Sequence, residues 1–457
     1  MTEQEIKTKI DAQRTFFKSN ITKDVKFRID SLRRLKTQII LHETEILDAL
    51  YHDLHKSDFE GYSTEVGIVI NEINVHIRHL RCWARPEYRL TPITLFPSCS
   101  KIYKEPYGVV LVIAPWNYPF QLLLNPLVAA IGAGTCVTLK SSPYSTATNG
   151  IIEKILNNVF AEEYVTIFHG HRDVNQMLLN QRFDYIFFTG SPILGKTVME
   201  AASKNLTPVT LELGGKSPCI IDYDADVDVA AKRVVWGKTI NAGQTCVAPD
   251  YLMVHELVKE KFVSSFSKYV AEFFGDNPSQ SPDYPRIVSQ KAMERLVGYL
   301  GEGSLVLGGR YDTERRYIEP TIITNLDNDS KLLTEEIFGP IFPLIIFNNI
   351  DEVISMINSK EKPLALYYFS SDQKKANKII RETSSGGVCI NDTIIHVANH
   401  RIPFGGVGNS GMGMYHGKYG FDTFTHKKSV VISKPTFDMN IKYPPYEGKF
   451  NKYKRFL

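Results

Sequence analysis

The sequence predicts an α/β fold with open, mostly parallel sheets. Beyond residue 105, apolar runs typical of buried strands alternate with amphipathic helices. The composition is that of an ordinary globular protein, with 457 residues of which 43% are hydrophobic and 23% charged. A chain of this length is compatible with about three domains. The sequence contains no internal repeat and no low-complexity tract.

Residues 1–80 are expected to be helical. The N-terminal residues carry charges throughout and lack an apolar stretch, so we expect no signal peptide. Residues 86–105 contain three prolines and an alternating stretch at 101–104, which favours a linker followed by an exposed strand. A second alternating stretch at 429–434 is expected to pair with it. The apolar face of the second helix is predicted from spacings of three and four between Ile29, Leu32, Leu35 and Ile39.

The 33 residues from 107 to 139 carry no charge and are long enough to cross a bilayer. Prolines at 115, 119 and 126 interrupt this stretch, and its polar side chains would lack partners in lipid. A continuous apolar run is also typical of a strand buried on both faces. We therefore predict a buried unit of a strand at 108–114, a helix at 120–132 and a strand at 135–139, with no transmembrane segment.

The remaining elements follow from the same patterns. Further strands are predicted at 164–168, 185–188, 218–221 and 251–254. Further helices are predicted at 151–159, 194–203, 257–274 and 351–357.

The charge balance and the cysteines exclude several classes of protein. The chain has 53 Lys and Arg against 50 Asp and Glu, and a net charge of +3 gives no reason to expect nucleic acid as a partner. Six scattered cysteines favour reduced thiols and a cytoplasmic location. His76 and His79 lack further ligands nearby, so no metal site is expected. The basic and aromatic segment 441–457 could touch an anionic membrane weakly, although a tail packed on protein surface is the preferred interpretation.

Small and polar residues surround one thiol at 241–246, where the sequence reads NAGQTC. A nucleophilic cysteine needs exposure and surroundings that favour the thiolate. Taken alone, the motif favours an ordinary buried thiol at Cys246 over a catalytic one.

A carboxyl group lies in an unusual place at Glu212, between two leucines at the end of a predicted strand. An apolar environment would raise its pKa toward the range of a general base. The glycine pair Gly214 and Gly215 that follows would let the backbone approach another group closely. A structural carboxylate at a strand edge is the alternative.

Two further loops follow predicted strands. Gly190 and Ser191 come directly after the 185–188 strand and before a proline, which predicts a helix N-terminus able to bind phosphate. Taken alone, a plain turn between strand and helix is the preferred interpretation, because the pattern is not G-x-G-x-x-G. Asn117 lies in a proline-bounded turn and could donate to an oxyanion, or could equally be an ordinary turn residue. Glu336 and Phe338 could hold ribose hydroxyls and a flat ring, or could be turn residues.

Taken together, these motifs resemble the NAD(P)-dependent aldehyde dehydrogenases, and in particular the shorter class 3 branch. The resemblance covers essentially the whole chain, and the segment 415–429 is particularly similar to class 3. Its most specific parts are TPVTLELGGKSPC at 207–219, NAGQTCVAPDY at 241–251, EEIFGP at 335–340, EKPLALY at 361–367, SSGGVCIND at 384–392 and PFGGVGNSGMG at 403–413.

This resemblance implies a role for each matching residue. Cys246 matches the nucleophile that forms a thiohemiacetal, Asn117 the side-chain donor to its oxyanion, and Glu212 the base that activates water to hydrolyse the thioester. The cofactor-binding positions are matched by Lys140, Gly190, Ser191, Glu336 and Phe338. The aldehyde tunnel is matched by Tyr118, Leu122, Trp236 and Ile240, with residues near Val397. These tunnel residues are apolar, so we expect medium- or long-chain aliphatic or aromatic aldehydes as substrates.

One departure from the family pattern concerns the cofactor. Many members have K-P-S-E where this chain has Lys140, Ser141, Ser142 and Pro143. The missing Glu would repel a 2′-phosphate, so we expect NADP to be accepted as well as NAD.

The resemblance also implies a Rossmann-type cofactor domain, an α/β catalytic domain and a small β oligomerisation element. We assign residues 1–85 and 106–209 to the first, 210–415 to the second, and 86–105 with 416–457 to the third and the tail. Class 3 relatives form dimers, so a homodimer is expected. The alternatives are a semialdehyde dehydrogenase with a small polar substrate, a cysteine hydrolase without redox cofactor, a non-catalytic family member and a CoA-dependent acyl transferase.

Overall fold

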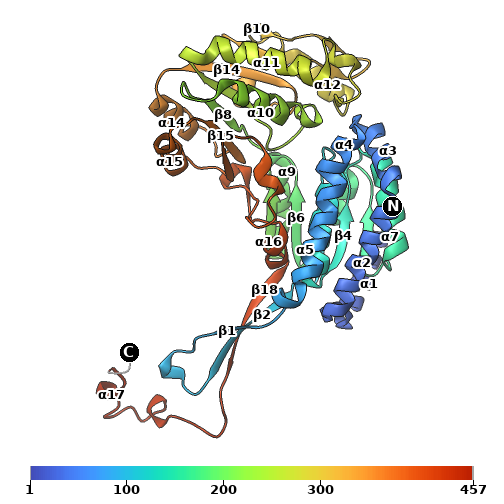
Figure 1. Ribbon diagram of the computed structural model, residues 1–457. Coiled ribbons are helices and arrows are strands. Elements are labelled where there is room, and N and C mark those ends of the chain that lie inside the picture. The colour runs from blue at the N-terminus through green and yellow to red at the C-terminus, as the bar shows by residue number, and fades with distance from the viewer. Residues whose placement is uncertain (1, 455–457) are drawn as a thin grey trace.

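The computed structural model describes residues 2–454. Figure 1 shows two α/β lobes, one around each large sheet, and a narrow arm that projects from the body. The N-terminal helices, drawn in blue, cover the lobe with the six-stranded sheet. The predicted α/β fold with mostly parallel sheets is confirmed.

Five helices precede the first large sheet. They are α1 (Glu3–Lys18), α2 (Val25–Leu41), α3 (Glu43–Leu54), α4 (Asp58–Gly61) and α5 (Gly67–Trp83). A π-helical turn, Tyr62–Val66, joins α4 to α5. At the start of α1 the Thr2 hydroxyl accepts from the Glu5 N–H while the Glu5 carboxylate accepts from the Thr2 N–H, which satisfies two otherwise free donors. The predicted apolar face of α2 is confirmed, since all four of its residues are buried.

The first sheet has six strands in the order β17-β7-β6-β3-β4-β5. Its strands are β3 (Val109–Ile113), β4 (Cys136–Lys140), β5 (Val165–Phe168), β6 (Tyr185–Thr189), β7 (Val209–Glu212) and β17 (Gly411–Met412). Only β17 runs antiparallel to its neighbour. The connections between the parallel strands are α6 (Gln121–Ala133), α7 (Thr146–Val159), α8 (Arg172–Leu179) and α9 (Pro192–Ser203).

The uncharged stretch at 107–139 is therefore β3, α6 and β4, and every residue of these three elements is buried. Between residues 2 and 454, none of the helices combines the length and apolarity that a membrane crossing requires.

The second sheet has seven strands in the order β10-β13-β14-β9-β8-β15-β16. These are β8 (Pro218–Ile221), β9 (Tyr251–His255), β10 (Ser304–Leu307), β13 (Thr321–Thr324), β14 (Ile341–Phe347), β15 (Ala365–Phe369) and β16 (Gly387–Ile390). Only β10 runs antiparallel. The helices of this lobe are α10 (Val227–Thr239), α11 (Lys259–Phe274), α12 (Gln290–Tyr299), α13 (Lys331–Thr334), α14 (Ile350–Asn358) and α15 (Gln373–Glu382). A hairpin of β11 (Tyr311–Asp312) and β12 (Tyr317–Ile318) completes it.

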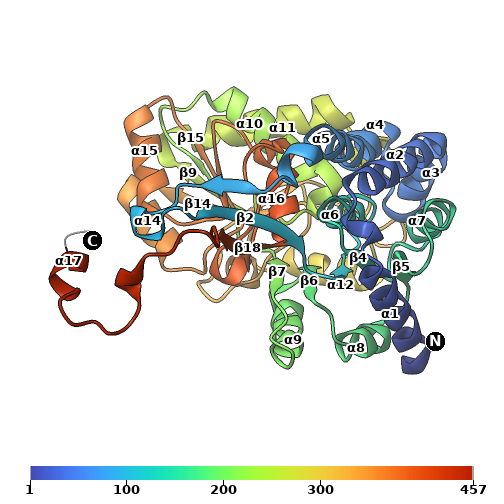
Figure 2. The same cartoon turned by 90° about the horizontal axis from the view of Figure 1, so that it is seen from below.

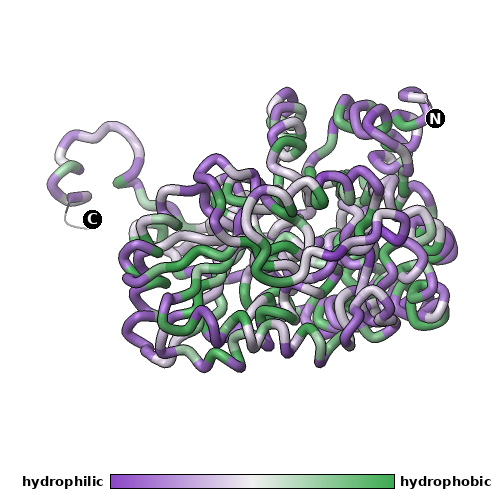
Figure 3. The backbone as a smooth tube through the Cα atoms, turned by 90° about the horizontal axis from the view of Figure 1, so that it is seen from above, coloured by the Kyte–Doolittle hydropathy of each residue, from purple (hydrophilic) through white to green (hydrophobic). Residues whose placement is uncertain are grey.

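The arm is a three-stranded antiparallel sheet of β1 (Glu87–Arg89), β2 (Cys99–Pro106) and β18 (Thr425–Ile432). Lys101 faces Val430 and Ile102 faces Ser429, so the predicted pairing of these two segments is confirmed. Before β18, α16 (Gly417–Thr423) packs against α5 and α6. After β18, the tail runs away from the body to α17 (Phe450–Lys454), as Figure 2 shows. Figure 3 shows that the tail is mostly hydrophilic, whereas the hydrophobic stretches lie in the body.

The first sheet reaches beyond residue 209, the predicted end of the cofactor domain. Strand β7 ends at Glu212, and β17, from the segment assigned to the catalytic domain, pairs with it. The chain thus crosses between the lobes at 213–217, directly after Glu212.

Candidate active site

The predicted site residues follow strands whose ends meet between the two lobes. Strands β3 and β6 are neighbours, and the chain leaves β3 toward β4 but leaves β6 toward β7. Such a switch point opens a crevice at the carboxyl ends of parallel strands. Asn117 follows β3 and Ser191 follows β6, so both lie at this edge of the sheet.

A turn of left-handed residues precedes Cys246. Asn241, Ala242 and Gly243 have φ values of 50°, 51° and 74°. This conformation costs roughly 1–3 kcal/mol at each residue other than glycine, so it has to be stabilised by its surroundings. A Cβ atom at position 243 would lie 2.4 Å from the carbonyl oxygen of Gly339, and only glycine fits there.

The Asn117 side chain contacts this turn directly. Its amide Nδ2 donates to the carbonyl of Gln244 at 3.0 Å, which leaves its second N–H available. The backbone carbonyl of Asn117 accepts from Asn241 Nδ2 at 2.7 Å and from Lys56 Nζ at 3.1 Å. Asn117 is 3% exposed, so these bonds determine its orientation. The structure therefore brings together the two predicted loops, 117–118 and 241–246.

Glu212 ends β7 and is buried, with both carboxyl oxygens unpaired within the described part of the chain. Burial raises its pKa well above the usual value, because the ionised form loses its hydration. A carboxyl group in this state can hold a proton or accept one from a weak acid such as water.

The Cys246 thiol lies near two carboxyl groups. Burial, followed by the charges of Glu336 and Glu212, raises the pKa of the thiol to about 12. The surroundings therefore favour the neutral thiol, since negative groups disfavour a second negative charge. The thiol needs a base to become nucleophilic, and Glu212 and Glu336 are the carboxylates near enough to affect its pKa.

Cys246 opens onto a cavity of about 750 Å³. The four predicted tunnel residues, Tyr118, Leu122, Trp236 and Ile240, all line it, and so does Val397. Trp236, on α10, is 40% exposed and lies toward the outside. The Tyr118 hydroxyl is hydrogen-bonded to Thr245 Oγ1 at 2.6 Å, which places this ring beside residues 241–246, the cysteine loop. Aromatic and aliphatic side chains make up most of the remaining lining, including Phe59, Ile68, Phe273, Phe274, Ile394 and Phe404.

The predicted cofactor residues surround the carboxyl edge of the first sheet. Lys140 ends β4 and is 1% exposed. Its ammonium donates to the carbonyls of Ser141 at 2.6 Å and Gly170 at 2.8 Å, and burial lowers its pKa to about 8. Ser191 caps the N-terminus of α9, and the Gly190 N–H donates to the carbonyl of Glu212.

Glu336 and Phe338 approach the same region from the second lobe. Burial raises the pKa of Glu336 to about 8. A Cβ atom at Gly214 would lie 2.1 Å from this carboxylate, so the glycine allows Glu336 to lie against the backbone. Phe338 has a positive φ of 50°, and its ring meets that of Trp116 edge-on with centroids 5.5 Å apart.

Comparison with known proteins identifies the family. The model described as "Aldehyde dehydrogenase family" matches residues 1–430. The chain is 47% identical, over 99% of both chains, to the 4,4'-diaponeurosporen-aldehyde dehydrogenase of Staphylococcus aureus (strain NCTC 8325 / PS 47). The chain belongs to the aldehyde dehydrogenase family.

Other relatives agree with this assignment. Aldehyde dehydrogenase family 3 member B1 of Mus musculus is 42% identical, over 96% of this chain and 95% of the relative. The dimeric NADP-preferring aldehyde dehydrogenase of Canis lupus familiaris is also 42% identical, over 97% and 98%. The solved structure "Substrate bound state of Staphylococcus Aureus AldH" superposes with a TM-score of 0.97 at 46% identity, over 99% of both chains. The predicted resemblance to class 3 is confirmed, and the protein oxidises aldehydes with NAD or NADP.

The residues of this aldehyde dehydrogenase fit a nicotinamide dinucleotide. Thr189 Oγ1, at the end of β6, is buried without a partner among the described residues. The buried Lys140 ammonium has carbonyl partners alone and can donate to ribose hydroxyls. Free N–H groups at the start of α9 suit a pyrophosphate. Nothing in residues 2–454 forms a cluster of three or more potential metal ligands.

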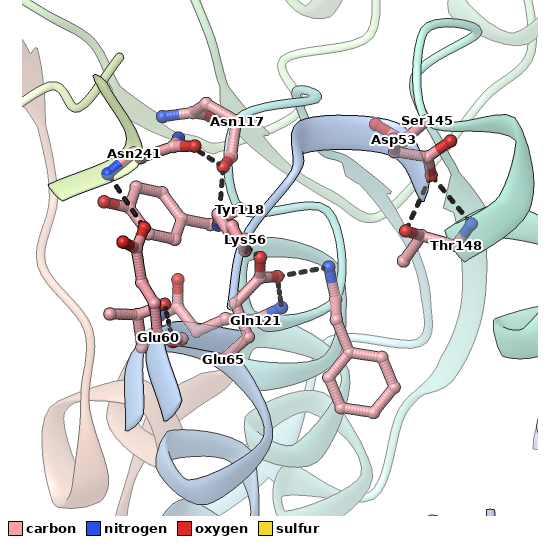
Figure 4. Close-up of polar contacts among 12 residues, drawn as sticks. Asp53, Lys56, Glu60, Glu65, Asn117, Tyr118, Gln121, Ser145, Thr148 and Asn241 are labelled. Atoms are coloured by element: carbon pink, nitrogen blue, oxygen red, sulfur yellow. Dashed lines mark hydrogen bonds and ion pairs between the residues drawn. The ribbon is translucent and has the colours of Figure 1, made fainter. Parts of the chain in front are cut away.

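Sequence reasoning missed a buried polar network beneath the cysteine loop, which Figure 4 shows. Lys56 and Glu65 form an ion pair at 2.5 Å with both side chains fully buried. The second Glu65 oxygen accepts from the N–H groups of Phe120 and Gln121, at the start of α6. Glu60 accepts from the Asn241 N–H at 2.8 Å. No sequence motif marks Lys56, Glu60 or Glu65, which lie in the segment 1–80 that was predicted only as helices.

Proposed function

We propose that this aldehyde dehydrogenase oxidises apolar aldehydes, of medium or long aliphatic chain or aromatic, to carboxylic acids through a covalent intermediate on Cys246. The observation that carries the proposal is the cavity of about 750 Å³, lined mainly by apolar side chains, onto which this thiol opens. The Staphylococcus aureus relative is named for a carotenoid aldehyde, which is a long apolar substrate.

In the first step the Cys246 sulfur attacks the aldehyde carbon after losing its proton to a nearby carboxylate. The free Asn117 N–H donates to the oxygen of the resulting thiohemiacetal, where negative charge develops. When bound, a nicotinamide dinucleotide supplies the hydride acceptor that converts this species to a thioester.

In the second step Glu212 takes a proton from water, and the water oxygen attacks the thioester carbon. The carbon–sulfur bond then breaks, the carboxylic acid leaves, and Glu212 returns its proton to the sulfur, which restores the Cys246 thiol. Because Glu212 has no hydrogen-bond partner between residues 2 and 454, its carboxylate can turn toward the water or the cofactor without breaking a bond. This base argues for water as the acyl acceptor, in preference to CoA.

We infer that both NAD and NADP are accepted. Pro143 stands where many relatives carry the glutamate that would repel a 2′-phosphate, and the canine relative is named NADP-preferring. Steady-state kinetics with both cofactors test this inference, and a thousandfold preference for NAD would contradict it.

We also infer a cytoplasmic homodimer. All six cysteines are free thiols, and the canine relative is named dimeric. The arm exposes apolar side chains that a second subunit could cover, including Tyr88, Leu90, Ile93, Phe96 and Val431. Light scattering of the purified chain distinguishes dimer from monomer.

The central experiment follows NAD(P)H formation at 340 nm with hexanal, decanal, benzaldehyde and succinic semialdehyde. We expect turnover of the apolar aldehydes, no turnover in Cys246→Ala, and a single burst without further turnover in Glu212→Gln. Turnover of the semialdehyde alone would contradict the substrate class. A cysteine hydrolase would need a histidine on the nucleophile, and within residues 2–454 the thiol bonded by histidine is that of Cys389, through His396, and not Cys246.

A further inference from the structure

We propose that the Glu60 carboxylate is a specificity-determining group that excludes anionic aldehydes from the substrate cavity by charge repulsion. The inference rests on the proposed function, because it concerns the same cavity. According to this proposal, the negative charge of Glu60 excludes anionic aldehydes, and the apolar lining of the cavity does not account for their exclusion by itself.

Glu60 is part of the cavity wall. It lies in α4, beside Phe59 and near Ser63 and Thr64, and all four residues line the cavity. One carboxyl oxygen accepts from the Asn241 N–H at 2.8 Å, which ties the side chain to the turn before Cys246. Figure 4 shows the carboxylate beside Asn241 and the ring of Tyr118. The second oxygen is therefore available to face whatever occupies the cavity.

Among the described residues that line the cavity, none carries a positive charge near pH 7 that could pair with this carboxylate. The described lining residues include Glu60 and Asp283 but neither lysine nor arginine. His416 also lines the cavity, and burial lowers its pKa to about 4, so it is neutral near pH 7. The cation behind the wall, Lys56, is already paired with Glu65 at 2.5 Å. A carboxylate on the substrate would thus be desolvated next to negative charge with no counter-ion.

The charge on Glu60 depends on pH. Burial raises its pKa to about 7, Lys56 and the Asn241 N–H oppose this rise, and Glu65 and Asp283 add to it. Tyr118, the other titratable group beside it, has a pKa raised well above its usual value and stays neutral. Glu60 is therefore largely ionised at pH 8.5 and largely neutral at pH 6, so exclusion should strengthen as pH rises.

The test compares two aldehydes of equal length, neutral hexanal and the anion 6-oxohexanoate. We measure kcat/KM for each at pH 8.5 with wild type, Glu60→Gln and Glu260→Gln. The glutamine keeps an oxygen for the Asn241 N–H and removes the charge. The control carboxylate, Glu260, is 87% exposed on α11. We expect wild type to prefer hexanal and Glu60→Gln to shrink that preference about tenfold. Glu260→Gln should leave it unchanged, and the wild-type preference should weaken at pH 6.

An unchanged preference in Glu60→Gln would overturn the inference, since desolvation by the apolar wall would then account for the exclusion. An equal fall for both aldehydes would overturn it too, because it would mark Glu60 as a support for Asn241 only. Failure of wild type to oxidise hexanal would instead count against the proposed function. Calorimetry then tests the Glu60 charge without turnover, by measuring the Kd of hexanamide and of the anion 6-amino-6-oxohexanoate. We expect Glu60→Gln to reduce the preference of the wild type for hexanamide about tenfold. An unchanged ratio of the two Kd values would overturn the inference.

Discussion

The buried ion pair beneath the cysteine loop leads to a quantitative prediction. Replacing Lys56 by methionine leaves the Glu65 carboxylate fully buried without its cation. Removal of one partner from such a pair costs about 3–5 kcal/mol. We expect the lower end, about 3 kcal/mol, because Glu65 keeps the N–H groups of Phe120 and Gln121 at 2.9 and 3.2 Å.

This cost converts to a measurable change in melting temperature. An unfolding entropy of roughly 2.1 cal/mol/K per residue gives the chain about 1 kcal/mol/K, so Lys56→Met should lower Tm by about 3 °C. The double variant Lys56→Met/Glu65→Gln should recover part of the loss, because no buried charge remains unpaired. Activity should fall in both variants, since the backbone carbonyl of Asn117 loses one of its two donors whenever Lys56 is replaced.

Differential scanning fluorimetry and kcat with hexanal measure both effects. The control is Lys154→Met, which removes an exposed pair with Glu45 and should shift Tm by less than about 1 °C. A Tm of Lys56→Met equal to that of the wild type would refute this prediction. It is equally refuted if the losses of Lys56→Met and Glu65→Gln simply add in the double variant, because the coupling of the two charges is the basis of the estimate.

Three further predictions concern the active site. Asn117→Ala should lower kcat by about 100- to 1000-fold with little change in KM, because it removes a donor to the developing oxyanion. A rise in KM of that size with kcat unchanged would show that Asn117 contributes to substrate binding and not to the transition state. Gly243→Ala should lose activity and Tm together, because its Cβ would lie 2.4 Å from the Gly339 carbonyl oxygen, and an active, stable variant would contradict the turn described above. The raised pKa of Glu212 keeps its carboxyl group protonated at low pH. The single-turnover rate of thioester hydrolysis should therefore rise with pH, with a midpoint well above 4.5, and Glu212→Gln should remove this dependence. A flat wild-type profile would rule out Glu212 as the base.

The strands could be predicted because the parallel sheets are buried on both faces. Their residues form continuous apolar runs, and β8 spans the predicted 218–221 while β3 falls inside the predicted 108–114. The pairing of the arm could be predicted because both segments alternate between apolar and polar residues. The boundaries of helices were less accurate, as in α7, which begins at Thr146, five residues before the predicted start.

The polar network could not be predicted because its partners are far apart in the chain. Glu60 and Asn241 are separated by 181 residues, and Lys56 and Asn117 by 61. Local patterns carry no information about such contacts. The carboxyl groups of Glu336 and Glu212 near the Cys246 thiol could not be predicted for the same reason, since both residues are distant from it in the chain.

The arm has a consequence for how the protein emerges from the ribosome. Glu105 of β2 pairs with Lys428 of β18 across 323 residues of chain. At about 5–20 residues per second, β2 waits on the order of 15–60 s for this neighbour. Both lobes have time to form before β18 pairs with β2. Until then, one edge of β2 is unpaired and could pair with a strand of another nascent chain. Synthesis that stops before residue 425 leaves this edge permanently unpaired, so truncated products should depend on chaperones more than the full chain does.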